Sequence, residues 1–198
     1  TDLAHVGTGM IPSFVLHIPM LELSNQMPKV KELCNKFGFD IKPIFTSEEK
    51  SSGGFYEVYT KLTLGMSEKE ILTNLKLMIL KMCDKEKALR KEILKKEELR
   101  LTDEVNRAYG IITHARLISH KEAEVLISYI KLGLDMNLYE EDIEKKLSKL
   151  NVYELLNAIN DKALELEINT DEKIKVDELR TKKIQEIIFD LLDDNNDK

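Results

Sequence analysis

The hydrophobic and polar positions divide the chain into a strand-rich first third and a helical remainder. Apolar and polar residues alternate loosely over residues 10–20 and again over residues 55–64. This period predicts strands, because successive strand side chains point to opposite faces. A further strand is predicted over residues 39–45, after a short helix over residues 28–37. The last two strands, joined by the polar loop 46–54, predict an antiparallel hairpin.

From Gly65 onward the pattern has the helical period. Ser67-x-x-Glu70 predicts a capping box at the start of a helix. The charged stretch 84–100 predicts a solvated helix face, with an interaction surface as the alternative. Apolar side chains recur at spacings of three and four residues in three stretches: Leu75, Met78, Ile79 and Met82; Ala123, Leu126, Ile127, Ile130 and Leu134; and Ile184, Ile187, Ile188, Leu191 and Leu192.

The order of these elements predicts the fold class. Strands come first and helices follow, so we predict an α+β fold in which helices pack on an incomplete antiparallel sheet of about three strands. So small a sheet implies that further strands lie upstream, or that a partner covers an edge. The length of 198 residues predicts one domain over residues 1–192, followed by a disordered acidic tail over residues 193–198.

Composition narrows the function classes. The net charge of −6 argues against a nucleic-acid partner, which a basic face would favour. With no apolar run of membrane-spanning length and no signal peptide, we expect a cytoplasmic protein without a membrane partner. Cys34 and Cys83 are predicted to be reduced thiols, a disulfide being the alternative. His114 and His120 lack the i, i+4 spacing of a helical metal pair, so no metal site is predicted.

Two stretches match a known family. One is Asp103–Asp135, and the other is the opening around Gly7-Thr8-Gly9, which continues into the "VLHIP" strand. Together they resemble the catalytic domain of the ATP:guanido phosphotransferases, in the bacterial protein arginine kinase branch, over roughly residues 1–190. The resemblance implies a guanidino-kinase type of fold and covers the back part of the catalytic unit, so the family's first strands and several nucleotide-binding arginines are expected upstream. The matching positions in the first stretch are Asp103, Val105, Arg107, Tyr109, Gly110, Ala115, Arg116, Lys121, Glu122, Ala123, Ser128, Leu132, Gly133 and Asp135.

The resemblance also assigns catalytic positions. The family's reactive cysteine falls on Asp2, and its acidic residue falls on Ser47. Glu48 and Glu49 stand next to Ser47 and are the candidates to replace its missing carboxylate. No residue of this chain is therefore a confident catalytic group.

The family's nucleotide-binding positions fall on four residues of this chain. Its phosphate-binding arginine falls on Ile11, within a motif that ends at Ser13, and a second arginine of the clamp falls on Lys42. His17 matches a histidine that lies against the nucleotide. Losing one preorganised donor to developing charge costs about 2.7–4 kcal/mol of barrier, and an ammonium cannot form the bidentate contacts of a guanidinium.

The resemblance also implies a phosphoarginine-binding motif near the C-terminus. Asp177 and Arg180 match it, whereas its leading arginine is replaced by Val176. At a spacing of i, i+3 on a helix, the two retained residues predict a surface ion pair. The alternative is a remnant of the phosphoarginine pocket.

These substitutions predict a degenerate nucleotide site. We therefore expect a non-catalytic regulatory or interaction protein that binds a protein partner or forms a homodimer, and that needs no cofactor. The alternative is an active phosphotransferase on protein arginine, completed by an upstream segment and using ATP with Mg²⁺. The loop Gly7-Thr8-Gly9 fits residual phosphate binding as well as a simple turn.

Overall fold

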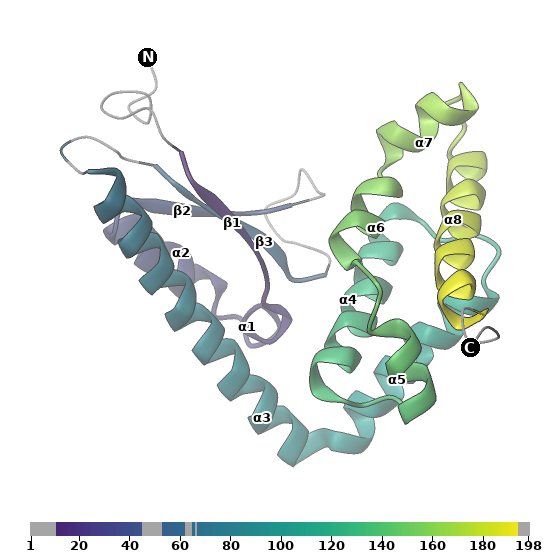
Figure 1. Cartoon of the computed structure of the whole chain (residues 1–198), viewed down its shortest axis with the longest axis horizontal. Coiled ribbons are helices and arrows are strands. Elements are labelled where there is room, and N and C mark those ends of the chain that lie inside the picture. The colour runs from purple at the N-terminus through teal and green to yellow at the C-terminus, as the bar shows by residue number, and fades with distance from the viewer. Residues whose placement is uncertain (1–10, 45–52, 62–64, 66, 194–198) are drawn as a thin grey trace. The chain divides into compact units, whose positions relative to one another are not determined.

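The chain forms two compact units, Thr1–Lys95 and Lys96–Lys198, and each is described by itself. The structure is a computed structural model that describes residues 11–44, 53–61, 65 and 67–193 (Figure 1). The first unit contains the sheet, and the second is helical. Of the helices in the described ranges, none combines the length and apolar character that crossing a membrane requires.

In the part of the first unit that the structure describes, the sheet has three antiparallel strands in the order β1-β3-β2. They are β1 (Ser13–His17), β2 (Phe39–Pro43) and β3 (Phe55–Thr60). This arrangement confirms the predicted α+β class, the small antiparallel sheet and the pairing of the last two strands. Most of the loop between β2 and β3, residues 45–52, lies outside the described residues.

The first strand is shorter than predicted, because helix α1 (Pro19–Leu23) follows it directly. Proline has no N–H to give to a sheet, and its fixed φ suits the first position of a helix. The Ile18 amide instead donates to the Gly54 carbonyl at 2.8 Å. Gly54 has a φ of 69°, and a Cβ there would lie 2.6 Å from the Pro19 Cα. Only glycine therefore fits where these two segments meet.

Two helices cover one face of the sheet (Figure 1). They are α2 (Met27–Lys36) and the first part of α3 (Glu68–His114), which is interrupted by non-helical geometry at Glu97. The predicted capping box is present: the Glu70 amide donates to the Ser67 hydroxyl at 3.3 Å, and the Ser67 amide donates to the Glu70 carboxylate at 2.8 Å. The core between sheet and helices consists of Leu16, Ile18, Leu21, Val30, Cys34, Phe39, Ile41, Tyr56, Val58, Leu75, Met78 and Met82.

Within its described residues, 96–193, the second unit contains the end of α3 and five further helices. These are α4 (His120–Met136), α5 (Glu141–Leu147), α6 (Val152–Ala158), α7 (Asp161–Ile168) and α8 (Lys173–Asp193). The predicted apolar stripes of α4 and α8 supply buried residues such as Ile127 and Ile188. Apart from Asp193, the last residue of α8, the predicted acidic tail lies outside the described residues.

Several positions of the family motif are packing positions in this unit. Val105, Ala123 and Leu132 are all buried. A Cβ at Gly133 would lie 2.5 Å from the Val105 side chain and 2.6 Å from the ring of Tyr139. The motif therefore describes how α3 and α4 meet inside the second unit.

Candidate functional site

The sheet presents one apolar and one polar face. Residues directly opposite on neighbouring strands point to the same side, so the register places Lys42 beside Glu57, and Asp40 beside Tyr59. The same register adds Ser13 to the row of Tyr59. We call these five residues, Ser13, Asp40, Lys42, Glu57 and Tyr59, the polar face. The predicted nucleotide positions Ser13 and Lys42 are thus brought to one side of the sheet.

Lys42 is engaged by its neighbours on this face. Its Nζ lies 3.0 Å from the Glu57 carboxylate and 5.0 Å from the centre of the Tyr59 ring. The hydrogen bond to Glu57 raises the pKa of Lys42. Burial alone would raise the pKa of Glu57, but hydrogen bonds from Ser13 and Lys42 lower it overall. Both charges are therefore stabilised by a pair internal to the face.

A second carboxylate lies one row away. Asp40 accepts hydrogen bonds from its neighbour's amide, Ile41 N–H, at 2.8 Å and from the Tyr59 hydroxyl at 3.4 Å. The ammonium of Lys61 lies 3.6 Å from the same carboxylate. Burial and the negative charge of Asp40 raise the pKa of Tyr59. Lys42 of the polar face and the neighbouring Lys61 are therefore each paired with a carboxylate, so the face holds no surplus of positive charge.

Of the other predicted site positions, the structure describes Ile11 but not the two catalytic positions. Ile11 precedes β1 and is 41% exposed, so an aliphatic side chain meets solvent there. Asp2 and Ser47, and with them Glu48 and Glu49, lie outside the described residues. The catalytic positions stay predictions.

His17 belongs to a buried network at the end of β1. Its ring packs on Phe55 with the ring centres 4.6 Å apart. The Arg90 guanidinium donates to the His17 carbonyl at 3.2 Å, and lies 3.4 Å from His17 Nδ1. Arg90 Nε also donates to Glu86 at 2.8 Å. The histidine that the resemblance assigns to the nucleotide is thereby tied to α3.

Glu86 is an exception to the predicted solvated face. Most residues of the stretch 84–100 are exposed, as predicted, but Glu86 is only 3% exposed. Its carboxylate accepts the amides of Met20 at 3.1 Å and Leu21 at 2.9 Å, which are free donors in the first turn of α1. The sequence carries two signals for Glu86: it lies four residues after Met82, on the apolar stripe of α3, and it stands at i, i+4 spacing to Arg90.

Asp177 and Arg180 do form the predicted ion pair, but not at the surface. Arg180 is fully buried, and its guanidinium contacts both Asp177 and Asp161. It also donates to the carbonyls of Ile159 at 3.1 Å and Ile118 at 3.0 Å. The side chain thus joins α8 to α7 and to the segments before α4 and after α6. The guanidinium N–H groups of Arg180 therefore donate to partners within the second unit.

A histidine extends this network. His120 Nε2 lies 3.3 Å from Glu124, and its Nδ1 lies 3.7 Å from Asp161. Glu124 is 2% exposed, so this is a buried polar cluster on α4. Within the described ranges, no group of three or more His, Cys, Asp or Glu side chains has the arrangement of a metal site. The contact between His120 and Glu124 has the i, i+4 spacing of one helix and could be read from the sequence, whereas the approach of Asp161 from α7 could not.

Comparison with protein families divides the chain as the structure does. Residues 1–89 match the ATP:guanido phosphotransferase C-terminal catalytic domain, and residues 98–198 match the Protein-arginine kinase McsB C-terminal domain. These matches confirm the resemblance inferred from Asp103–Asp135 and from the opening loop.

Curated relatives lead to the same family. A protein-arginine kinase of Halothermothrix orenii is 36% identical over 148 residues, which are 75% of this chain and 42% of that protein. One of Clostridium botulinum is 36% identical over 154 residues (77% and 45%), and one of Staphylococcus epidermidis is 32% identical over 184 residues (93% and 52%). The chain spans about half the length of these relatives. It belongs to the ATP:guanido phosphotransferase family, in the protein-arginine kinase branch.

Proposed function

We propose that this chain is a protein-arginine kinase-like module with a degenerate nucleotide site, which acts as a non-catalytic regulatory or interaction protein. The observation that carries the proposal is the contact of 3.0 Å between Lys42 and Glu57. The cation at the position of a family phosphate clamp is neutralised by a carboxylate that lies directly opposite it in the sheet. Binding a triphosphate would require breaking this pair beside a second carboxylate, Asp40.

The residues of the polar face fit ATP poorly. Phosphoryl transfer depends on cations that neutralise the developing charge on the phosphate. Ile11 offers no charge, and Lys42 offers a point charge that is already paired. Loss of each preorganised donor costs about 2.7–4 kcal/mol of barrier, so the two positions together account for the loss of most of the catalytic rate.

The proposal is tested with radiolabelled ATP, Mg²⁺ and an arginine-containing protein substrate. We expect no phosphoarginine, and no rise in the melting temperature of the chain when ATP is added. A ligand present at 100 times its Kd would stabilise the fold by about 2.7 kcal/mol, so binding would be visible. Label transferred by the unaltered chain would overturn the proposal.

Restoring the lost charge provides the complementary experiment. The double variant Ile11→Arg with Glu57→Gln adds a guanidinium and releases Lys42, so we expect it to gain an ATP-dependent rise in melting temperature. The matched control is Phe14→Arg with Glu57→Gln, because Phe14 is also exposed (48%) but belongs to the alternate side of β1. Equal gains in both variants would show that total charge, not the polar face, governs nucleotide binding.

An active phosphotransferase on protein arginine is the second candidate function. Two observations favour it: the relatives are named protein-arginine kinases, and this chain spans about half of their length. In that case an upstream segment would supply the missing groups, with ATP and Mg²⁺ as co-substrate and metal. A chimera that places the N-terminal part of the Halothermothrix orenii protein before this chain tests it. Activity of the chimera, absent from either part alone, would establish this candidate over the first.

A further inference from the structure

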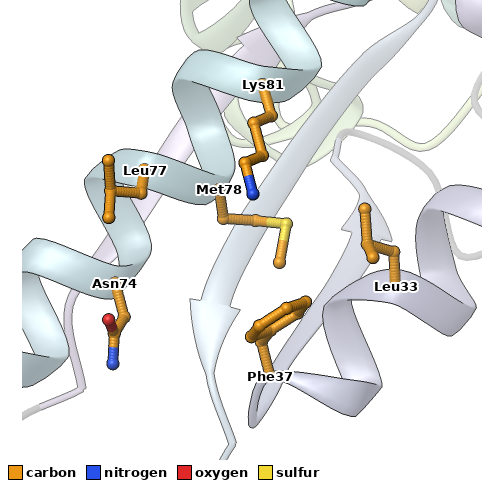
Figure 2. A pocket seen from close by; sticks show the side chains of 6 residues that line it. All are labelled: Leu33, Phe37, Asn74, Leu77, Met78 and Lys81. Carbon is orange, nitrogen blue, oxygen red and sulfur yellow. The ribbon is translucent and has the colours of Figure 1, made fainter.

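A groove runs between α2 and α3 on the first unit. Its volume is about 90 Å³, and Figure 2 shows its lining residues. The Met78 side chain extends toward the α2 side chains, while the Lys81 side chain reaches down beside it (Figure 2). The lining consists of Leu33 and Phe37 from α2, and Asn74, Leu77, Met78 and Lys81 from α3.

The apolar lining is unusually exposed. Phe37 is 54% exposed, Leu77 is 53% exposed and Leu33 is 39% exposed, whereas Met78 is buried. Single exposed apolar residues are ordinary, but a group that converges on one concavity marks an interaction site. The groove therefore has a buried apolar floor and apolar walls that meet water in this chain.

The charges around the groove specify the partner's chemistry. Lys81 is the charged residue of the lining, and we find no carboxylate partner for it among the described residues. Lys29 stands one helical turn before Leu33, and Lys85 stands one turn after Lys81. α2 as a whole carries three lysines against one glutamate, although the net charge of the chain is −6. The lining of the groove thus carries a positive charge, in a protein whose net charge is −6.

We propose that this groove binds an acidic amphipathic helix of a protein partner. One aliphatic or aromatic side chain of that helix would enter between Phe37 and Leu77, and a carboxylate one turn away would pair with Lys81. Two neighbouring helices form the kind of groove that accepts the apolar face of a third helix. A volume of about 90 Å³ suits a single anchoring side chain. The proposal rests on the interaction role proposed above, but on none of the residues of the polar face.

The test uses a fluorescein-labelled, alanine-based helical peptide of 18 residues, measured by fluorescence anisotropy. One peptide carries leucines along one face with flanking glutamates, and a second replaces the glutamates by lysines. We expect the acidic peptide to bind at least about tenfold more tightly than the basic one, because its carboxylates attract Lys81 while lysines repel it. Raising the salt concentration should reduce this difference.

Matched variants locate the binding site. Leu77→Ser and Lys81→Glu should each weaken binding of the acidic peptide about tenfold. Leu72→Ser and Lys76→Glu make the same changes on exposed α3 positions outside the lining, and should stay within about twofold of the unaltered chain. Since Leu77 and Leu72 are about half exposed, both serine variants are expected to fold. Equal effects of either variant and its control would overturn the proposal.

Two further outcomes separate this proposal from its rivals. If the chain self-associates in sedimentation, and Leu77→Ser abolishes this, a second copy occupies the groove and the proposal is wrong. The ATP assay is run on the same protein, so the two proposals fail independently. If the peptide binds and phosphoarginine also forms, the groove proposal stands and the non-catalytic role is refuted. If the peptide does not bind and no phosphoarginine forms, only the groove proposal is refuted.

Discussion

Replacing Arg180 by methionine tests whether this residue of the predicted phosphoarginine motif is a structural group. Arg180 is fully buried and contacts two carboxylates and two backbone carbonyls. Methionine retains much of the aliphatic volume but none of the donors. The variant therefore leaves Asp177, whose side chain is 16% exposed, and the two carbonyls without their shared partner.

The expected loss follows from these contacts. Removing one partner of a buried ion pair costs about 3–5 kcal/mol, and each unsatisfied buried acceptor costs about 1–3 kcal/mol. Asp161 is half exposed and can regain water, which lowers the total. We expect Arg180→Met to reduce the free energy of unfolding by at least about 3 kcal/mol, a large part of the 5–15 kcal/mol typical of a folded domain.

The matched control lies two residues along the same helix. Lys182 pairs with Glu178 at 2.6 Å, but their side chains are 60% and 52% exposed. Exposed pairs at i, i+4 contribute about 0.3–0.5 kcal/mol, so Lys182→Met should have little effect. Urea unfolding followed by circular dichroism gives the two free energies. Hydrogen exchange should place the loss of protection in α4, α7 and α8.

The reasoning would be refuted by equal stabilities of the two variants. A loss below about 1 kcal/mol for Arg180→Met would mean that the buried contacts contribute little. If such a variant also lost binding of free phosphoarginine that the unaltered chain showed, Arg180 would be a ligand-binding residue rather than a structural one. We expect no phosphoarginine binding by the unaltered chain, because the guanidinium is already engaged.

Three further predictions concern the first unit. Gly54→Ala should destabilise the chain by several kcal/mol in urea unfolding, because its Cβ would meet the Pro19 backbone. Gly65→Ala has a similar positive φ but open space around it and should cost about 1–2 kcal/mol; equal losses would exclude the clash with Pro19 as the cause. Burial raises the pKa of Cys34 to about 11. The stability contributed by the neutral thiol is therefore present below pH 9 and is lost as the pH rises toward 11. Rapid reaction of native Cys34 with Ellman's reagent at pH 8 would contradict this expectation. Glu86→Gln removes the charge of a buried carboxylate that accepts from Arg90 and from two backbone amides, so it should lower stability by about 2–4 kcal/mol in thermal unfolding. The exposed Glu32→Gln should cost less than about 1 kcal/mol, and a similar small loss at both would show that Glu86 adds no more than a surface pair.

The matched family motif illustrates how a sequence can identify a fold without identifying an activity. Val105, Ala123 and Leu132 are buried packing residues, and Gly133 permits a close helix contact. Packing in the core constrains the spacing of these residues. Ile11 and Lys42, which the resemblance assigns to the nucleotide, are exposed and are not constrained by that core. The motif consequently supported the family and the α+β class more firmly than it supported any reaction.

The sequence by itself determined the local elements. Capping at Ser67 and Glu70, the helical stripes, and the strand alternation at residues 55–60 all depend on residues within a turn or two of one another. Such short-range patterns are encoded directly by side-chain type and spacing. The start of α1 at Pro19 was also encoded locally, although the strand pattern obscured it.

Only the tertiary structure decided which charges meet. Lys42 and Glu57 are neighbours because of the strand register, and Glu86 is buried because it caps a helix distant in sequence. Arg180 is buried because α7 and the segments before α4 and after α6 meet around it. Each contact joins segments separated by a long stretch of chain, and a charged residue has the same letter whether it is solvated or enclosed. Charge pairing depends on distance and dielectric surroundings, and packing alone sets both of these.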